Sequence, residues 1–372
     1  MDAKYRKQLK KVKISGFKSI SAQNPVTIEF ESINVLLGAN GSGKSNIISF
    51  FKMLNFIMSG RFQLFVERAG TGQVFLNYGS KHTATIQGEM CFENRTNIDN
   101  YIFKLTHATP DRLIITSEEI VWGDKSRKPQ KFALASDFKE SGLISSENET
   151  AKTIRQILAN CKVYQFHDSS VESPIRKSAR TDLSNYLQAE GNNLSSFLYF
   201  LKENYPANYQ RIVSYIRLIM PQFKDFYLEP NERGYVMLKW TDVSLNDYIM
   251  LPEQFSDGTI RFIALATLLL QPKKTMPDVI IIDEPELGLH PFAITQLAEM
   301  IKEASKSTQV MIATQSPGLV DEFEANQITI VERDEESEST VVKKLNKEEL
   351  SDWLENYALS ELWNKNILGG RP

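Results

Sequence analysis

The chain has 372 residues, 42% of them hydrophobic, so it is long enough to bury a large core as one elaborate domain or as two lobes. Its 43 basic and 46 acidic residues nearly balance, which excludes a global attraction to nucleic acid or membrane and leaves any DNA contact to a local patch. Cys91 and Cys161 stand far apart and the four histidines show no metal-binding spacing, which argues against a disulfide framework, a zinc site or a transition-metal centre and fits a reducing compartment.

The amino end is basic, but no long apolar stretch follows it, so we do not expect a secretory signal. Its cations are Lys4, Arg6, Lys7, Lys10, Lys11 and Lys13. The longest apolar stretch, residues 262–270, is far shorter than the ~20 residues that cross a bilayer, and it predicts a buried helix. We therefore expect a cytoplasmic protein that does not enter a membrane.

Short β-rich runs open the chain, and the third of them leads into a glycine-rich loop and an apolar helix. The runs are residues 12–17, 26–30 and 33–37, and the helix is 47–57. From Ala84 the apolar residues alternate with polar ones, which predicts an antiparallel meander. Residues 123–150 are polar and are predicted to form a loop.

The apolar period then changes from two to 3.6, which predicts a helical lobe in the middle of the chain, and afterwards strands alternate with helices again. The lobe helices are expected at 194–201 and 212–219, and the later strands at 279–282 and 310–313, with a helix opened by Pro291 between them. Residues 328–331 and 340–345 flank an acidic turn and predict a hairpin. Residues 350–357 predict a last amphipathic helix.

Residues 38–45 read Gly-Ala-Asn-Gly-Ser-Gly-Lys-Ser and fit the phosphate-binding pattern GxxxxGK[ST] between an apolar strand and a helix. The N–H groups of such a loop and the helix N-terminus attract phosphate. We expect Lys44 to reach the β- and γ-phosphates of a nucleoside triphosphate and the Ser45 hydroxyl to ligate Mg²⁺. The residues expected to hold the nucleotide are Asn40, Gly41, Ser42, Gly43, Lys44, Ser45 and Asn46.

Four apolar residues, 279–282, precede Asp283 and Glu284 and predict a buried parallel strand that ends in two carboxylates. Open α/β sheets bind ligands at the carboxyl ends of their strands. Asp283 is expected to hold the Mg²⁺ shell and Glu284 to polarise the attacking water, with Glu286 as the second candidate base. A plain strand exit is the alternative, and the phosphate-binding loop elsewhere in the chain counts against it.

The loop at 38–45, together with Asp-Glu-Pro-Glu-Leu-Gly-Leu-His-Pro at 283–291, resembles the RecF/SMC/OLD branch of ABC-type ATPases, where OLD means overcoming lysogenization defect. The resemblance spans residues 12–80 and 250–335 and is strongest over 251–317. It implies an α/β P-loop NTPase of the ABC type that uses ATP and Mg²⁺. An antiparallel β subdomain and a helical lobe would be inserted between the Walker A and Walker B halves.

This resemblance divides the chain into four parts. We expect residues 1–90 to form the N-terminal half of the ATPase core with Walker A, and 91–250 to form the β meander and helical insertion lobe. Residues 251–335 would form the C-terminal half with signature, Walker B and switch, and 336–372 a return strand, helix and tail.

Residues 253–261 precede an apolar helix at the position where ABC-type enzymes carry their signature. The resemblance implies that Ser256 and Gly258 bind the γ-phosphate held by the other subunit. Asp257 stands where the transporter form has a second glycine, and it places an anion near that phosphate. An ordinary helix cap at Ser256 or Asp257 is the alternative.

Thr-Gln-Ser-Pro at 314–317 resembles the switch segment that usually reads Thr-His-Ser-Pro. Gln315 can hydrogen-bond a phosphate or water in place of the histidine, but it cannot carry a positive charge, so we expect slow turnover. A capping turn is the alternative. Residues 287–290 resemble the D-loop, which crosses to the opposing subunit, and their alternative is a simple helix N-terminal turn.

Two further residues match the family by position. Gln73 is a candidate Q-loop residue, although a surface loop is the favoured interpretation. Lys18 resembles the basic residue near the nucleotide in the SMC-like branch, and a solvated strand end is its alternative.

The resemblance also implies that a second chain completes each site, so ATP would hold together a homodimer or a higher even oligomer. Our first hypothesis is a regulatory ATPase for a separate effector, such as a nuclease in antiviral defence, because too few residues follow Glu284 for the Toprim nuclease domain of OLD proteins. The alternative is a RecF-like ATP-dependent DNA-binding protein in repair or recombination, which would use the basic amino end and the helical lobe. A transporter subunit fits Asp257 and Gln315 poorly, and the missing heptads exclude an SMC arm.

Overall fold

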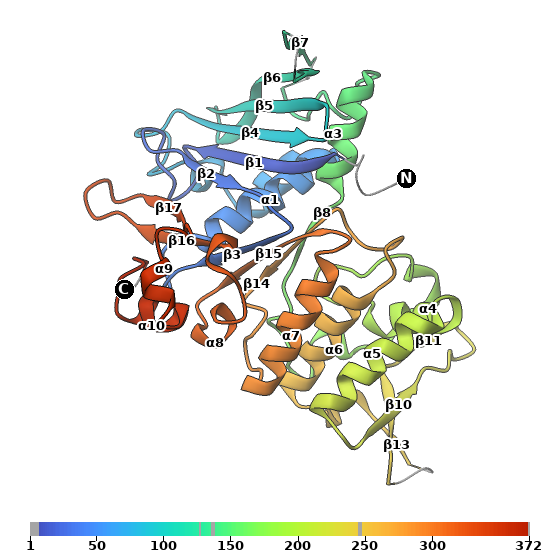
Figure 1. Cartoon of the computed structure of the whole chain (residues 1–372). Coiled ribbons are helices and arrows are strands. Elements are labelled where there is room, and N and C mark those ends of the chain that lie inside the picture. The colour runs from blue at the N-terminus through green and yellow to red at the C-terminus, as the bar shows by residue number, and fades with distance from the viewer. Residues whose placement is uncertain (1–6, 126–127, 135–137, 245–247, 371–372) are drawn as a thin grey trace. The chain divides into compact units, whose positions relative to one another are not determined.

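The computed structural model describes residues 7–125, 128–134, 138–244 and 248–370. Contacts between residues group the chain into two units, Met1–Lys162 with Glu324–Pro372, and Val163–Phe323 (Figure 1). Lys4 and Arg6 of the basic amino end and parts of the polar stretch 123–150 lie outside the described residues. Within the described ranges, no helix is long and apolar enough to cross a membrane.

An antiparallel sheet of six strands makes up much of the first unit, in the order β2-β1-β4-β5-β6-β7. The strands are β1 (Gln8–Ser15), β2 (Val26–Glu29), β4 (Thr85–Glu93), β5 (Asn97–Ala108), β6 (Arg112–Asp124) and β7 (Gln130–Ala133). Every second residue of β4 is buried, among them Ile86 and Met90, as expected for a strand with one face on a core. The predicted meander is therefore confirmed in β4, β5 and β6.

The prediction of a loop over residues 123–150 is wrong in part. β6 extends to Asp124, β7 lies within the stretch, and the helix α3 (Glu149–Ala159) begins at the end of the stretch. β7 pairs antiparallel with β6, from Glu119 opposite Ala133 to Trp122 opposite Gln130. All four side chains of β7 are exposed, so its sequence carries no alternation of apolar and polar residues. The strand is held by main-chain pairing and by an ion pair between Lys131 and Glu119, neither of which hydrophobic periodicity detects.

A second group of strands in the first unit positions the glycine-rich loop. β3 (Ile33–Leu37) is buried at every position and pairs in parallel with β16 (Ile328–Arg333). β16 in turn pairs antiparallel with β17 (Thr340–Lys344), which confirms the predicted hairpin. The loop after β3 leads into α1 (Lys44–Met58), as the sequence predicts. α1 packs against the antiparallel sheet, where the rings of Phe50 and Phe103 stack with centroids 6.1 Å apart.

The first unit is completed by short helices. They are α2 (Phe62–Arg68), η2 (Gly72–Phe75), α3 (Glu149–Ala159), η6 (Ala325–Gln327), α9 (Ser351–Leu354) and α10 (Leu359–Asn364). The predicted amphipathic helix over 350–357 is wrong, because α9 is a single turn and both Trp353 and Tyr357 are exposed. These rings contact each other, and Nζ of Lys365 lies 3.9 Å from the Tyr357 ring centroid. The buried residues of this region belong to α10 instead.

The chain passes into the second unit at β8 (Cys161–Tyr164). Here β14 (Val279–Asp283) and β15 (Gln309–Thr314) pair in parallel, as predicted. The helices are α4 (Leu194–Asn204), α5 (Pro206–Ile219), α6 (Asp257–Leu270), α7 (Pro291–Ala304), α8 (Pro317–Val320), η3 (Pro174–Arg176), η4 (Thr181–Leu183) and η5 (Pro252–Gln254). α5, α6 and α7 lie side by side (Figure 1). The predicted lobe helices and the buried helix over 262–270 are confirmed.

Small sheets accompany the helices of the second unit, which the sequence did not predict. One contains β10 (Phe223–Tyr227), β12 (Lys239–Asp242) and β13 (Ile249–Met250), and the other pairs β9 (Ala179–Arg180) with β11 (Tyr235–Val236). Strands of two to five residues are too short to show a periodic pattern.

Candidate functional site

The loop between β3 and α1 depends on glycine at two positions. Gly41 has φ 81° and Gly43 has φ 109°, in the left-handed region that side chains disfavour. A Cβ on Gly43 would also collide with Oγ1 of Thr340. That hydroxyl donates to the carbonyl oxygen of Ser42 at 3.0 Å and hydrogen-bonds Oγ of Ser19 at 2.7 Å. A threonine of β17 therefore fixes the shape of the loop, and no sequence motif points to it.

The polar groups of this loop are suited to a phosphate. Lys44 is buried, and its Nζ donates to the carbonyl oxygens of Gly38 at 2.6 Å and Ala39 at 2.8 Å. Oγ of Ser42 is buried without a hydrogen-bond partner among the described residues. A buried hydroxyl without a hydrogen-bond partner costs about 1–3 kcal/mol of stability, and a phosphate oxygen would accept a hydrogen bond from it. Ser45, the predicted Mg²⁺ ligand, is exposed at the first turn of α1.

The other candidate residues of the first unit include Asn40, Asn46 and Lys18. Nδ2 of Asn46 donates to Oγ of Ser19 at 2.7 Å, and Asn40 is exposed. Nζ of Lys18 donates to Oγ of Ser49 on α1 at 2.8 Å, and burial, helped by the charge of Lys52, lowers the pKa of Lys18.

Gln73 is exposed in η2, as expected for a surface loop. Its Oε1 accepts a hydrogen bond from Oγ of Ser80 at 3.1 Å, and its N–H donates to Oδ1 of Asp111 at 3.2 Å. Its hydrogen bonds are thus local to the surface around η2.

In the second unit, the acid pair lies at the carboxyl ends of the parallel strands β14 and β15. Asp283 is buried, and its Oδ2 accepts a hydrogen bond from Nε2 of Gln165 at 2.9 Å. Nε2 of His167 lies 3.1 Å from the carbonyl oxygen of Asp283. Glu284 has φ 44°, a left-handed conformation that costs about 1–2 kcal/mol, and its N–H donates to the carbonyl oxygen of Ala313 at 2.8 Å. The backbone therefore leaves the extended conformation of β14 at Glu284.

The switch-like segment after β15 contacts both candidate bases. Nε2 of Gln315 donates to Oε1 of Glu284 at 3.2 Å. Oγ1 of Thr314 donates to Oε1 of Glu286 at 2.5 Å, while Oε2 of Glu286 is buried without a partner among the described residues. Burial raises the pKa of Glu286. Glu284 is half-buried and contacts Gln315, whereas Glu286 is buried.

The signature-like segment begins α6 and contacts the D-loop-like segment 287–290. Oγ of Ser256 accepts from the N–H of Thr259 at 3.1 Å, so the residue does cap the helix. A Cβ on Gly258 would collide with the carbonyl oxygen of Gly288. Nη1 of Arg261 donates to the carbonyl oxygen of Leu287 at 3.0 Å. These contacts explain why glycine occupies position 258.

Three polar residues of the second unit were missed by the sequence analysis. Gln165 and His167 follow the apolar end of β8, and Arg176 ends η3. Their positions just after a short apolar strand are the signal that points to Gln165 and His167, because strand ends carry ligand-binding residues. Arg176 has no such signal.

The predicted residues are thus divided between the units. Residues 40–46 belong to the first unit, whereas Ser256, Gly258, Asp283, Glu284 and Gln315 belong to the second. Within the second unit, the structure brings Gln315 to Glu284, and Ser256 and Gly258 lie together at the start of α6.

A family model matches most of the chain. Residues 33–321 match the model of a family described as "AAA domain, putative AbiEii toxin, Type IV TA system". No curated protein matches the chain in sequence.

Among the solved structures that share the fold are two SMC head domains. One is the crystal structure of an SMC head (SmcHead) bound to the C-winged helix domain of ScpA, with a TM-score of 0.60 and 17% identity over 93% of this chain and 99% of that one. The other is the Smc head domain with an extended coiled coil, bound to the C-terminal domain of ScpA from Pyrococcus furiosus. It has a TM-score of 0.60 and 17% identity over 94% of this chain and 99% of that one. The predicted ABC-type P-loop fold and the resemblance to RecF/SMC-like ATPases are confirmed.

Proposed function

The chain belongs to this AAA-domain family, and from that premise we propose that it binds and hydrolyses ATP at an interface between two copies of itself and acts as a switch for a separate effector. The observation that carries the proposal is the cluster at the ends of β14 and β15, where a buried aspartate, a second acid and a glutamine amide converge. Such a cluster is typical of sites that orient a water molecule beside a phosphate.

Each residue has a role in this proposal. Lys44 leaves the carbonyl oxygens of Gly38 and Ala39 and bonds the β- and γ-phosphates, and Ser42 donates its unpaired hydroxyl to the same phosphates. Glu284 accepts a proton from the attacking water, which the Gln315 amide helps to orient. Asn40, Gly41 and Gly43, through their main chain, and Asn46 complete the phosphate cradle.

Ser45 and Asp283 are the residues that would hold Mg²⁺, which supplies charge neutralisation between the phosphates when it is bound. Both offer oxygen atoms, the ligand type that Mg²⁺ prefers. Gln165 donates to Oδ2 of Asp283 and so fixes the orientation of that carboxylate.

We propose that Ser256 and Gly258 of a second copy close each site. The N-terminus of α6 then adds its dipole and backbone N–H groups to the γ-phosphate. ATP binding holds the two copies together and hydrolysis releases them, so the useful output is a change of assembly.

The effector that responds to this change of assembly is proposed to be a protein, with a nuclease in antiviral defence as the leading candidate. The two similar head domains were each crystallised with a domain of ScpA, which favours a protein partner over direct action on nucleic acid. The free thiols of Cys91 and Cys161 agree with a place in the reducing cytoplasm.

The second candidate is a RecF-like ATP-dependent DNA-binding protein. The cations Lys10, Lys11 and Lys13 of β1 are the local basic feature that favours it. ATP-dependent duplex binding that weakens steeply with salt would distinguish this function from the first.

The test uses the Glu284→Gln chain, which should bind ATP without hydrolysing it. We expect Mg²⁺ and ATP to convert it from monomer to dimer in size-exclusion chromatography with light scattering, and an affinity-tagged sample to retain the effector from cell extract. A Lys44→Ala chain is the matched control and should neither bind ATP nor pair. A Glu284→Gln chain that binds ATP yet remains monomeric would contradict the proposed function.

A further inference from the structure

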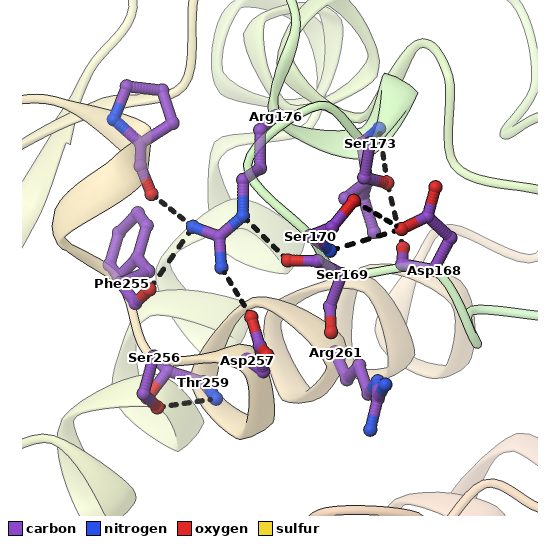
Figure 2. A network of polar contacts seen from close by, with 12 residues as sticks. Asp168, Ser169, Ser170, Ser173, Arg176, Phe255, Ser256, Asp257, Thr259 and Arg261 are labelled. Atoms are coloured by element: carbon purple, nitrogen blue, oxygen red, sulfur yellow. Dashed lines mark hydrogen bonds and ion pairs between the residues drawn. The ribbon is translucent and has the colours of Figure 1, made fainter.

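Arg176 is a buried cation that belongs to none of the predicted motifs. Its side chain is 3% exposed, whereas that of its ion-pair partner Asp257 is 65% exposed. Nη2 of Arg176 donates to Oδ1 of Asp257 at 3.0 Å (Figure 2). A buried guanidinium requires a counter-charge, and here that charge comes from the middle of the signature-like segment.

The other donors of Arg176 hold the backbone that precedes this segment. Nη1 donates to the carbonyl oxygens of Pro252 and Phe255, the second at 3.1 Å, and Nε donates to the carbonyl oxygen of Ser169 at 2.9 Å. The planar, forked guanidinium makes all these bonds at once, which the ammonium of a lysine cannot do. One side chain therefore fixes the main chain on the N-terminal side of α6.

A turn of its own presents Arg176 in this position. Oδ1 of Asp168 accepts from the N–H of Ser170 at 3.1 Å and from its Oγ at 2.7 Å. Oγ of Ser173 donates to the carbonyl oxygen of Asp168 at 2.7 Å and caps η3, which ends at Arg176. Figure 2 shows this turn beside the start of α6. The guanidinium is thus aimed by a hydrogen-bonded element rather than by a free loop.

The negative charge of Asp257 explains why a buried cation is needed beside the signature-like segment. Asp257 is the first residue of α6, directly between Ser256 and Gly258, so a phosphate that reaches those two residues meets its carboxylate. Repulsion between the two anions opposes binding. The guanidinium offsets that repulsion because it lies against the carboxylate on the buried side.

We propose that Arg176 is a positioning residue that neutralises Asp257, so that the signature-like segment of one copy can receive the γ-phosphate held by another. The inference rests on the proposed function, because it concerns the pairing of two copies through ATP. Arg176 does not touch the phosphate. It acts through the charge of Asp257, and its bonds to the carbonyl oxygens of Pro252 and Phe255 hold the guanidinium in place.

The experiment compares variants in the Glu284→Gln background, which is the parent. The variants are Arg176→Gln, Arg176→Lys and the double variant Arg176→Gln with Asp257→Asn. The fraction of dimer is measured by light scattering against ATP concentration with Mg²⁺ present, and a fluorescent ATP analogue measures nucleotide binding in the same samples. Circular dichroism checks that each chain is folded.

We expect Arg176→Gln to need about tenfold more ATP to pair than the parent does. The double variant should return to within about threefold of the parent, because it removes the anion as well as the cation. Nucleotide binding to the separate chains should persist in all variants. A purely structural role for Arg176 would leave the double variant as defective as the single one, and that result overturns the proposal.

Two further outcomes are decisive. If Arg176→Gln does not fold, Arg176→Lys and the double variant carry the test, since each leaves no uncompensated anion, and loss of pairing in either overturns the inference. If Arg176→Gln pairs as the parent does, the inference alone is wrong. A parent that binds ATP and stays monomeric overturns both the inference and the proposed function.

Discussion

Nε2 of Gln315 donates a hydrogen bond to Oε1 of Glu284 at 3.2 Å, across the carboxyl ends of two neighbouring parallel strands. A neutral amide thus contacts the acid proposed to activate water. The amide can orient that acid or the water, but it adds no positive charge to the charge that develops on the phosphates. The pair therefore links the chemistry of β14 to the switch-like segment after β15.

Replacing Gln315 with histidine should speed hydrolysis. We expect kcat to rise by roughly three- to tenfold, with the larger gain near pH 6, because an imidazole with a pKa of about 6.5 carries a positive charge there. Phosphate release measured at about pH 6 and pH 8 checks both the gain and its pH dependence. Equal rates for the variant and the wild-type chain at both pH values would show that position 315 has no part in turnover.

Thr340→Val should weaken ATP binding while leaving the fold intact. The change keeps the shape that excludes a Cβ at Gly43 but removes the hydrogen bonds to Ser42 and Ser19, which is worth about 1 kcal/mol, or roughly fivefold in Kd. Thr340→Ser is the matched control, since it retains the hydroxyl. Calorimetric titration with an ATP analogue measures both, and equal affinities for the valine and serine variants would argue against the role of this hydroxyl.

The parts of the fold that the sequence predicted are those that a short, continuous stretch of residues specifies by itself. The loop at Gly38–Ser45 and the strand before Asp283 combine a motif with an apolar run, and both were found. Thr340 and Arg176 were missed because they act on residues that are 298 and 81 positions away in the chain. β7 was missed because its side chains are all exposed. Local pattern cannot report a contact that only the tertiary fold creates.

Glu286 should make the stability of the unliganded chain depend on pH. Burial raises its pKa above the ordinary value of 4.5, so the folded state binds this proton more tightly than the unfolded state does. The stabilisation that Glu286 contributes is therefore complete below pH 4.5 and is lost as the pH rises through the raised pKa of the folded state. The glutamine of the Glu286→Gln variant does not titrate. The melting temperature of this variant should therefore rise relative to that of the wild-type chain as pH increases. Parallel melting curves at every pH would contradict this assignment.

Gly258→Ala should disrupt the start of α6, because the added methyl group collides with the carbonyl oxygen of Gly288. We expect ATP-driven pairing to weaken by about tenfold or more, through displacement of either the signature-like segment or the D-loop-like segment. Gly318→Ala in α8 is the control, since its Cβ would meet no atom within 4 Å. Light scattering of the two variants in the Glu284→Gln background makes the comparison, and equal pairing would show that the space at Gly258 is not needed.

The central claim is that two copies complete each other's sites, and mixing two inactive chains tests it most directly. Lys44→Ala removes the phosphate-binding cation, and Ser256→Arg blocks the signature-like segment. Each chain alone should hydrolyse almost no ATP. An equimolar mixture should recover up to about half of the wild-type rate, because neither variant pairs with itself and each mixed dimer contains one intact site of two. A mixture as inactive as its two components would contradict the account.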